Sequence, residues 1–271
     1  MAASQKFTKT QGRRPGLAVI AVGQDPASLV YIGRKREKAK DLGIFFEEHS
    51  LEGSCASNTL KQKIEHLNEN PFIDGIILQL PIPPSLEVAP LLSLIAPTKD
   101  VDGLHPLNRG MLYSQSQEGF VPCTPLGCLY LLKAYGFSLA GKEVVVVGRS
   151  LLVGRPLAAL CLRENATVTI AHSQTKNLSS VTQRADFLFV ALGQPGFIRG
   201  FHVKKGAVVL DIGINRDGEN ALTGDVDFQE VVSVASALSP VPGGVGPLTV
   251  MGLMHNTLKA AFDQCALPFF L

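Results

Sequence analysis

The sequence predicts an α/β protein whose strands are parallel. Two observations support this prediction: short apolar runs alternate with helical stretches along the chain, and several of these runs are apolar at every position. Strands of that kind are expected where helices cover both faces of a sheet. The chain has 271 residues, which corresponds to roughly two domains. We therefore expect two α/β domains.

The first half contains two apolar runs typical of buried strands, at residues 17–22 and 75–80. Residues 28–42 and 58–68 have the composition and spacing of helices. The prolines between residues 81 and 84 end the second strand, because proline lacks the N–H group that a sheet requires.

The second half contains four apolar runs bounded by turn residues, and each predicts a strand: residues 144–147, 167–170, 187–191 and 208–212. A helix is expected behind the first of them, over residues 156–164. Since every strand is followed by a crossover, this half is expected to form a parallel sheet with helices on its faces.

Two stretches rich in proline and glycine, residues 122–127 and 240–247, are expected to act as hinges. An apolar helix follows each of them. We expect the last helix, from about residue 248 to 263, to return to the first domain. The predicted first domain is therefore residues 1–123 plus 248–271, and the second is residues 124–247.

Composition and charge exclude several classes of protein. Hydrophobic residues make up 46% and charged residues 18% of the chain, which is typical of a globular protein and not of a disordered one. The net charge is +2, from 25 basic and 23 acidic residues, and this balance argues against nucleic acid as the main ligand. No apolar run approaches the roughly 18 residues of a membrane helix. We expect neither a nucleic-acid nor a membrane partner.

The cysteines and the first residues bear on the compartment. The five cysteines are scattered and form no C-x-x-C pair, so we interpret them as free thiols in a reducing compartment. The first 24 residues contain no acid, a bias also seen in mitochondrial transit peptides, but they lack the apolar segment of a secretory signal. We interpret them as a frayed basic tail before the first strand, and expect a cytoplasmic protein.

The strongest local motif follows the four valines of residues 144–147. Gly148, a short turn and Gly154 lead from this buried strand into a helix, the geometry that places a dinucleotide pyrophosphate on backbone N–H groups. The motif departs from G-x-G-x-x-G, because Ser150 and Val153 take the second and third glycine positions. A purely structural turn would explain the motif about as well, but the strands around it favour a Rossmann-like nucleotide-binding domain.

The residues after the next strand favour NADP over NAD. An NAD-specific domain usually offers an acid about 20 residues after the glycine turn, and residues 171–175 contain none. Arg149 lies in the glycine turn itself, where a guanidinium suits a 2′-phosphate.

The first predicted helix of the first domain offers candidates for proton transfer. Helical spacing places Tyr31 and Lys35 on one stripe with Ala39 and Leu42. Burial on that stripe would lower the pKa of Lys35 and make it a usable proton carrier. Lys38 lies close to the same stripe, so spacing does not choose between them, and a solvated basic face is the alternative interpretation.

Polar residues at the ends of the predicted strands are further candidates. Gln79 ends the second strand, where ligand sites of parallel sheets lie, although such a residue also commonly bonds a loop. Asp100 and Asp102 place two carboxylates in a loop, as solvated charges or as a cation site that lacks a third ligand. The histidines show no ligand spacing, so no metal centre is expected. Cys123 is interpreted as a packing residue.

Taken together, these stretches resemble the bifunctional methylenetetrahydrofolate dehydrogenase/methenyltetrahydrofolate cyclohydrolase family. The matching segments follow one another over nearly the whole chain: residues 31–43, 74–83, 97–108, 122–127, 144–156, 211–215, 224–228 and 240–249. The resemblance implies two α/β domains flanking a cleft, and a homodimer. It also implies oxidation of 5,10-methylenetetrahydrofolate with NADP, followed by hydrolysis of the methenyl product to 10-formyltetrahydrofolate.

The resemblance further implies roles for individual residues on the folate side. Lys35 matches the catalytic lysine, Gln79 the residue that bonds to it, and Tyr31 the ring that packs on the folate. Asp102 matches the carboxylate that holds the pterin. The substrate-binding loop corresponds to Pro242, Gly243 and Gly244.

On the cofactor side, the resemblance assigns six residues to NADP: Gly148, Arg149, Ser150, Gly154, Ser173 and Ile214. Of these, Arg149 and Ser173 match the residues that meet the 2′-phosphate. The family usually has a strand and a further helix before the segment that begins at Pro15, and only 14 residues precede it here. Two alternatives remain: a monofunctional dehydrogenase of the same family, with either NAD or NADP, and a catalytically silent folate- or nucleotide-binding protein, which the short first segment would suit.

Overall fold

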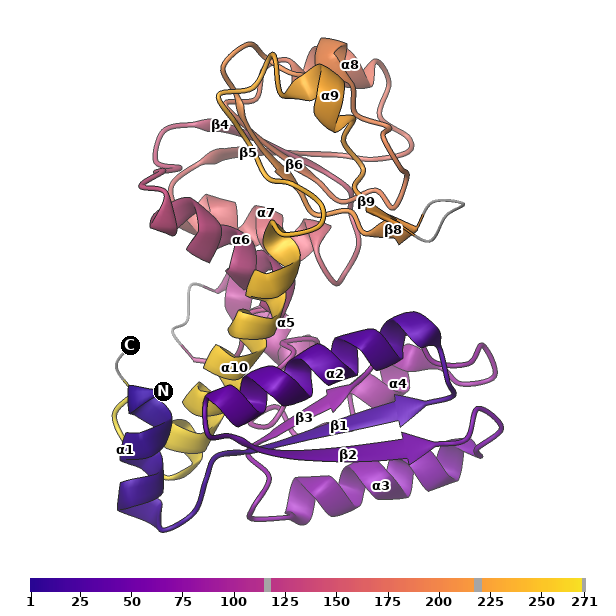
Figure 1. The fold of residues 1–271 in the computed structure, drawn as a ribbon, viewed down its shortest axis with the longest axis vertical. Coiled ribbons are helices and arrows are strands. Elements are labelled where there is room, and N and C mark those ends of the chain that lie inside the picture. Colours follow the sequence, from indigo (N-terminus) through magenta and orange to yellow (C-terminus); the bar gives the residue numbers. More distant parts are fainter. Residues whose placement is uncertain (115–117, 217–220, 270–271) are drawn as a thin grey trace. The chain divides into compact units, whose positions relative to one another are not determined.

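The computed structural model describes residues 1–114, 118–216 and 221–269, and the chain divides into two compact units (Figure 1). The first unit joins Met1–Cys123 to Val250–Leu271, and the second unit is Thr124–Thr249. Residues 270 and 271, part of the predicted first domain, lie outside the described residues. Each unit is built on a parallel sheet, so the predicted fold class is confirmed.

The sheet of the first unit has β1 (Gly16–Val22) at its centre, between β2 (Phe45–Leu51) and β3 (Gly75–Leu78). Both pairings are parallel, and β1 and β3 lie where strands were predicted. The edge strand β2 was not predicted, because none of its residues is fully buried and its sequence includes two glutamates and a histidine. It therefore lacks the continuous apolar run of its neighbours.

Alternate side chains of β1 enter two separate cores. Leu17, Val19 and Ala21 pack with α2 (Pro26–Asp41) and α10 (Val245–Gln264), whereas Ala18, Ile20 and Val22 pack with α3 (Ser57–Glu69) and α4 (Val88–Leu92). Figure 1 shows α2 and α3 on opposite faces of the sheet. The described helices of this unit are α1 (Ala2–Gln11), α2 (Pro26–Asp41), α3 (Ser57–Glu69), α4 (Val88–Leu92), α5 (Pro106–Tyr113) and α10 (Val245–Gln264) from residue 250 onward.

The expected frayed tail at the start of the chain is wrong: these residues form α1. Phe7 is fully buried, with its ring 5.4 Å from that of Phe262 on α10. The Ser4 hydroxyl donates to the Gly43 carbonyl at 3.1 Å. After the helix, the Arg13 guanidinium pairs with the buried Asp74 carboxylate at 2.7 Å. One aromatic side chain and one ion pair thus dock a helix whose exposed residues are mostly polar.

The sheet of the second unit is Rossmann-like, with five parallel strands in the order β10-β7-β6-β4-β5. Their bounds are β4 (Glu143–Val147), β5 (Thr167–Ala171), β6 (Phe187–Val190), β7 (Val208–Asp211) and β10 (Ala237–Leu238). The first four match predicted strands. The sequence order reverses at β4, which has β5 on one side and β6 on the other. Ligands of such sheets bind at this reversal, outside the carboxyl ends of the strands.

Helices cover both faces of this sheet, as its apolar strands require. In Figure 1, α6 and α7 lie on one face, and α8 and α9 on the other. The remaining elements are α6 (Cys123–Ala134), α7 (Gly154–Arg163), α8 (Leu178–Thr182), η1 (Gly200–His202), α9 (Phe228–Val231), β8 (Asn215–Arg216) and β9 (Leu222–Thr223).

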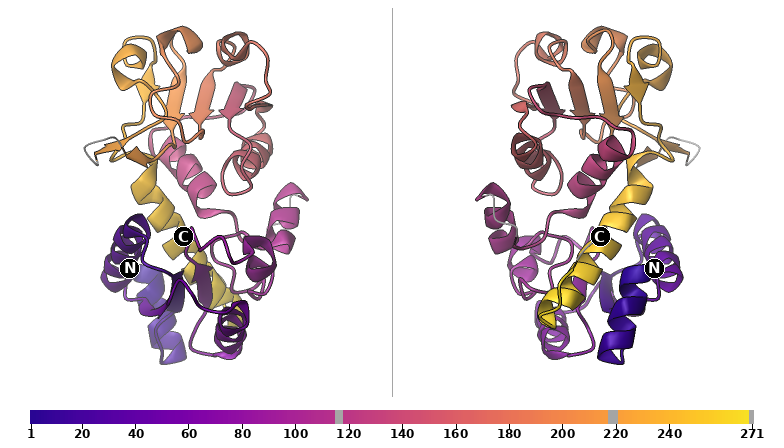
Figure 2. Two further views of the ribbon diagram at one scale, coloured as in Figure 1. Left: turned by 90° about the vertical axis from the view of Figure 1, so that its right-hand side faces the viewer. Right: turned by 90° about the vertical axis from the view of Figure 1, so that its left-hand side faces the viewer.

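The helices expected after the two hinge stretches begin inside them. α6 begins at Cys123 and α10 at Val245, so Pro125 and Pro247 both lie in a first helical turn. A proline is tolerated there, because the N–H groups of the first turn have no partner within the helix. Figure 2 shows α10 as one continuous helix, drawn in yellow.

Candidate active site

In the first unit, the structure brings Lys35 and Gln79 together. The Lys35 Nζ atom on α2 donates to the Gln79 Oε1 atom at 2.7 Å. Gln79 follows β3, and its backbone N–H donates to Ile20 at 2.8 Å while its Nε2 atom donates to Leu80 at 2.7 Å. Since the Nε2 atom bonds to Leu80, the carbonyl oxygen of the same amide is directed at the amine. The amide therefore orients Lys35 without adding a charge.

The protonation of Lys35 is shifted by its surroundings. Burial lowers the pKa of Lys35 below its ordinary value, and the nearby charge of Asp102 opposes that shift in part. Lys38 differs, because its amine lies 3.2 Å from Asp41 on the surface of α2. The structure thus distinguishes the two lysines that helical spacing left open, since Lys35 contacts Gln79 and Lys38 contacts Asp41.

Tyr31 lies one helical turn before Lys35 and is half-buried. Residues at this spacing share one face of a helix. The Arg34 guanidinium lies 5.9 Å from the centre of the Tyr31 ring.

Asp102 belongs to a loop that a buried carboxylate organises. Asp100 accepts hydrogen bonds from the backbone N–H groups of Leu104 at 3.1 Å and His105 at 2.7 Å, and from the Asn108 side chain at 2.8 Å. Burial nevertheless raises the pKa of Asp100 to about 6. Asp102 itself is half-buried.

Cys123 is buried, as a packing residue would be, but it also belongs to this site. Its thiol interacts with Asp102 and donates to the Val101 carbonyl at 3.3 Å. Burial raises the pKa of the Cys123 thiol well above its ordinary value, which argues against a nucleophile. One feature of the sequence indicated this placement, since Cys123 lies within the matching segment 122–127.

The cofactor residues predicted in the second unit lie at the carboxyl ends of its strands. Gly148 follows β4 with a φ of 130°, a conformation that favours glycine. A side chain at Gly154 would collide with the Gly148 carbonyl, so α7 begins directly against the turn. The Ser150 hydroxyl accepts the N–H groups of Val153 at 3.1 Å and Gly154 at 3.3 Å. Strand, turn and helix start thus form the arrangement expected for a pyrophosphate.

Arg149 and Ser173 follow two neighbouring strands, β4 and β5. β4 and β5 pair in parallel, with Val147 opposite Ala171, and each residue lies two positions beyond its strand. Both side chains are exposed, so both are free to reach a ligand at this edge. Ile214, in the loop after β7, is 45% exposed.

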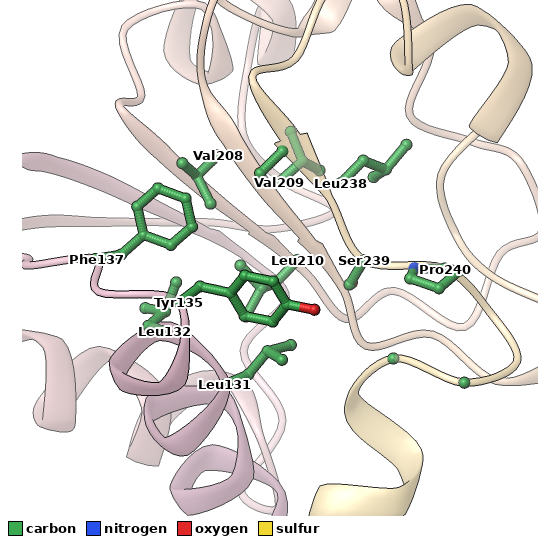
Figure 3. A pocket seen from close by; sticks show the side chains of 13 residues that line it. Leu131, Leu132, Tyr135, Phe137, Val208, Val209, Leu210, Leu238, Ser239 and Pro240 are labelled. Carbon is green, nitrogen blue, oxygen red and sulfur yellow. The ribbon is translucent and has the colours of Figure 1, made fainter.

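The predicted substrate residues Pro242, Gly243 and Gly244 belong to the second unit, in the loop before α10. Gly243 and Gly244 border a cavity of about 340 Å³. Figure 3 shows its labelled side chains, which come from the end of α6 and the loop after it, from β7, and from β10 and the residues that follow. This lining is mostly apolar, and none of its residues is an acid, a lysine or a histidine.

Two classes of site are not seen in the part of the chain that the structure describes. It contains no group of three or more His, Cys, Asp or Glu side chains able to hold a metal ion. Within the same residues, no helix has the length and apolar character needed to cross a membrane.

Comparison with known families decides the identity. Residues 1–102 match the catalytic domain of the tetrahydrofolate dehydrogenase/cyclohydrolase family, and residues 122–265 match the NAD(P)-binding domain of the same family. The chain belongs to this family. The resemblance seen in the sequence is therefore confirmed.

Individual members of the family are similar over nearly their whole length. The bifunctional protein FolD of Geotalea daltonii is 49% identical over 93% of this chain and 89% of its own. The crystal structure of the bifunctional FolD enzyme of Campylobacter jejuni is 42% identical, with a TM-score of 0.94, and covers 97% of this chain and 93% of its own. The Trypanosoma brucei FolD structure, a complex with NADP and an inhibitor, is 35% identical with a TM-score of 0.90, over 98% of this chain and 95% of its own.

This family membership confirms the predicted enzyme class. The chain is a methylenetetrahydrofolate dehydrogenase and methenyltetrahydrofolate cyclohydrolase. Neither the monofunctional dehydrogenase nor the silent binding protein is favoured. The short segment before β1 gives no support to the silent protein, because it forms a docked helix.

The lowered pKa of Lys35 leads to a direct test. We expect the Lys35 amine to titrate below the exposed lysines, and Gln79→Glu to raise its pKa, because a carboxylate at 2.7 Å favours the charged amine. NMR titration of isotopically methylated lysines measures both values. Gln62→Glu, the same change at an exposed position of α3, should leave Lys35 unchanged. An unshifted Lys35 in the Gln79→Glu variant would contradict this picture of the site.

Proposed function

We propose that Lys35 is the base of the hydrolytic step in this bifunctional enzyme. The observation that carries the proposal is the 2.7 Å contact between the Lys35 amine and the Gln79 carbonyl, in surroundings that lower the pKa of the amine. An ordinary lysine, with a pKa of about 10.4, would be almost fully charged near pH 7 and unable to accept a proton. Gln79 orients the amine, and its neutral amide does not favour the charged form as a carboxylate would.

Hydrolysis of the methenyl group needs such a base. Water adds its oxygen to the cationic methenyl carbon and loses a proton, which Lys35 accepts. One carbon–nitrogen bond then breaks as the remaining hydroxyl proton passes to the departing nitrogen, which leaves the formyl group on the other nitrogen. The positive charge of the substrate lowers the pKa of Lys35 further. Hydride transfer from the methylene carbon needs no base, so Lys35 acts there only by positioning.

We assign the folate to side chains around Lys35. Asp102 binds the pterin, because a carboxylate accepts two N–H bonds from an aminopyrimidinone edge. Tyr31, on the same helical face as Lys35, packs against the folate. The residues Pro242, Gly243 and Gly244 complete the set of substrate contacts.

The cofactor is NADP, and when bound it accepts the hydride from the methylene carbon. We propose that Gly148, Ser150 and Gly154 hold the pyrophosphate at the start of α7, with Ile214 against the cofactor from the loop after β7. Arg149 and Ser173 read the 2′-phosphate from the ends of two paired strands. This assigns folate catalysis to the first unit and NADP binding to the second.

We further propose a homodimer that forms along β5. This strand lies at the edge of its sheet and has only β4 as a neighbour in the described chain. Its Ile170 side chain is 38% exposed. An edge strand with exposed apolar side chains is suited to pairing with a second copy. The five free thiols support the cytoplasm as the compartment.

Replacing Lys35 by methionine separates the two activities. We expect Lys35→Met to lower the cyclohydrolase rate by about 10²–10⁴-fold, the usual contribution of a general base, while NADP binding is kept and the dehydrogenase changes less. Decay of methenyltetrahydrofolate absorbance, corrected for hydrolysis in buffer, measures the rate. Lys38→Met is the matched control. Hydrolysis by Lys35→Met at the parental rate would refute the assignment.

Replacing Arg149 by alanine tests the cofactor site. Hydrogen bonds to a charged group contribute about 1.5–3 kcal/mol each, so Arg149→Ala should weaken NADP by roughly one to two decades and NAD far less. Titration calorimetry with both nucleotides measures the difference. Arg184→Ala, at another exposed position of this unit, should bind as the parent does. Equal losses for both nucleotides would show that Arg149 does not read the 2′-phosphate.

A charge on β5 tests the dimer. We expect Ile170→Glu to convert the dimer to a monomer, because paired copies of β5 would bring two carboxylates into an apolar contact. Light scattering during size-exclusion chromatography gives the mass. Val232→Glu, at an exposed position after α9, should remain a dimer. A monomeric parent enzyme, or a dimeric Ile170→Glu variant, would contradict the proposed interface.

A further inference from the structure

Two buried aspartates connect the loops at the carboxyl edge of the second unit's sheet. Asp211 is the last residue of β7, and Asp225 lies after β9. Their exposed fractions are 4% and 0%. No lysine or arginine is paired with either one by an ion pair in the described residues. Buried carboxylates without a cation need hydrogen bonds to offset their desolvation.

Asp225 receives four such hydrogen bonds. Its Oδ2 atom accepts the backbone N–H groups of Leu192 at 2.5 Å and Gly193 at 2.9 Å, and its Oδ1 atom accepts that of Gln194 at 2.8 Å. The side chain of Asn215 donates the fourth bond, to Oδ1, at 2.8 Å. One carboxylate thus fixes three successive residues after β6 and one residue after β7.

Asp211 holds Asp225 in place. It accepts the backbone N–H groups of Gly213 at 3.0 Å, Asp225 at 3.0 Å and Val226 at 2.9 Å. A side chain at Gly224 would collide with the Asp211 carboxylate, so the chain before Asp225 passes directly over it. Burial raises the pKa of Asp211 to about 6, and the charge of Asp225 adds to this shift.

The loops fixed by Asp225 lie beside the proposed cofactor residues. Ile214 directly precedes Asn215, whose side chain Asp225 holds. The loop after β6 begins at Ala191. The Ala191 carbonyl lies so close to Gly148 that any side chain at position 148 would collide with it. A displacement of residues 191–194 would therefore shift the glycine turn through Ala191. It would also shift Ile214, through Asp225 and Asn215.

A carboxylate is the group that suits this position. All four neighbours are N–H donors, and a carboxylate offers only acceptors. Asparagine has nearly the same shape, but its NH₂ group would face N–H groups and leave donors unpaired. Because Asp225 is fully buried, its side chain presents no surface to a cofactor.

We propose that Asp225 is a positioning residue for NADP, which holds the loops after β6 and β7 in the arrangement that the cofactor meets. This inference rests on the proposed placement of NADP in the second unit. The loops are ordered before the cofactor arrives, so binding does not have to fix them. The opposing possibility is that the cofactor itself orders them.

The variant Asp225→Asn tests the proposal by kinetics. We expect its KM and dissociation constant for NADP to rise by about tenfold or more, because donors are left unpaired next to the binding loops. The kcat at saturating NADP, the KM for methylenetetrahydrofolate and the cyclohydrolase rate should stay at parental values. Measurements well below the midpoint of thermal unfolding separate this pattern from a general loss of stability. Parental affinity for NADP in a folded Asp225→Asn enzyme would overturn the proposal.

Asp227→Asn is the matched control. Asp227 lies two residues further on and caps α9, where its carboxylate accepts the Glu230 N–H at 3.0 Å. Asparagine caps a helix about as well as aspartate. The KM for NADP of this variant should equal that of the parent, and a rise matching that of Asp225→Asn would overturn the specific role of Asp225.

Hydrogen exchange of the unmodified enzyme gives a second test that needs no variant to fold. Without NADP, the amides of residues 192–194 should exchange on the order of 100-fold more slowly than in an unstructured peptide, since several bonds to one carboxylate must open. Free-peptide rates that slow only when NADP is added would overturn the proposal. Failure of the parent enzyme to bind NADP at all would instead refute the placement of NADP in the second unit.

Discussion

Parallel pairing of the strands is the constraint on which both sites of this enzyme depend. In a parallel sheet all carboxyl ends meet at one edge, so the loops that follow the strands meet there too. In the first unit this places Gln79 directly after β3. In the second unit it places Gly148, Ser173 and Ile214 after β4, β5 and β7. The residues proposed for proton transfer and for cofactor binding thus lie at the carboxyl edges of two different sheets.

Loops gathered in this way need hydrogen-bond acceptors, because they have no regular partners for their backbone N–H groups. Buried aspartates supply them in both units. Asp100 organises the loop of Asp102, and Asp211 with Asp225 organises the loops after β6 and β7. The raised pKa values of Asp100 and Asp211, both about 6, reflect how strongly burial disfavours these charges. These buried aspartates lie in the loops that carry the proposed ligand residues.

The sequence was informative wherever a local pattern determines the structure. The valines of β4 and the apolar run of β1 predict buried strands, since both faces of each are covered. Helix α1 was missed, because its docking depends on Phe7 meeting Phe262 from the other end of the chain. Strand β2 was missed because an edge strand is only partly buried and tolerates charged residues.

The candidate site shows the same division between local and distant information. Spacing on α2 indicated a lysine on the packed face but did not separate Lys35 from Lys38, since only a contact with Gln79, 44 positions away, does so. Matching segments supplied the cofactor residues. The hydrogen bonds of Asp225 were not predicted, because its three backbone donors come from residues 31 to 33 positions earlier in the chain.

The composition of the first unit's core also determines when this protein can finish folding. One face of β1 packs against Val250, Leu253, Met254 and Leu258 of α10, so that core stays incomplete until α10 has been synthesised. The second unit, Thr124–Thr249, is one uninterrupted segment, and all its strands emerge from the ribosome before α10 does. During translation the nucleotide-binding unit can therefore fold while the folate unit still exposes an apolar face. That face is a natural substrate for chaperones until the last helix arrives.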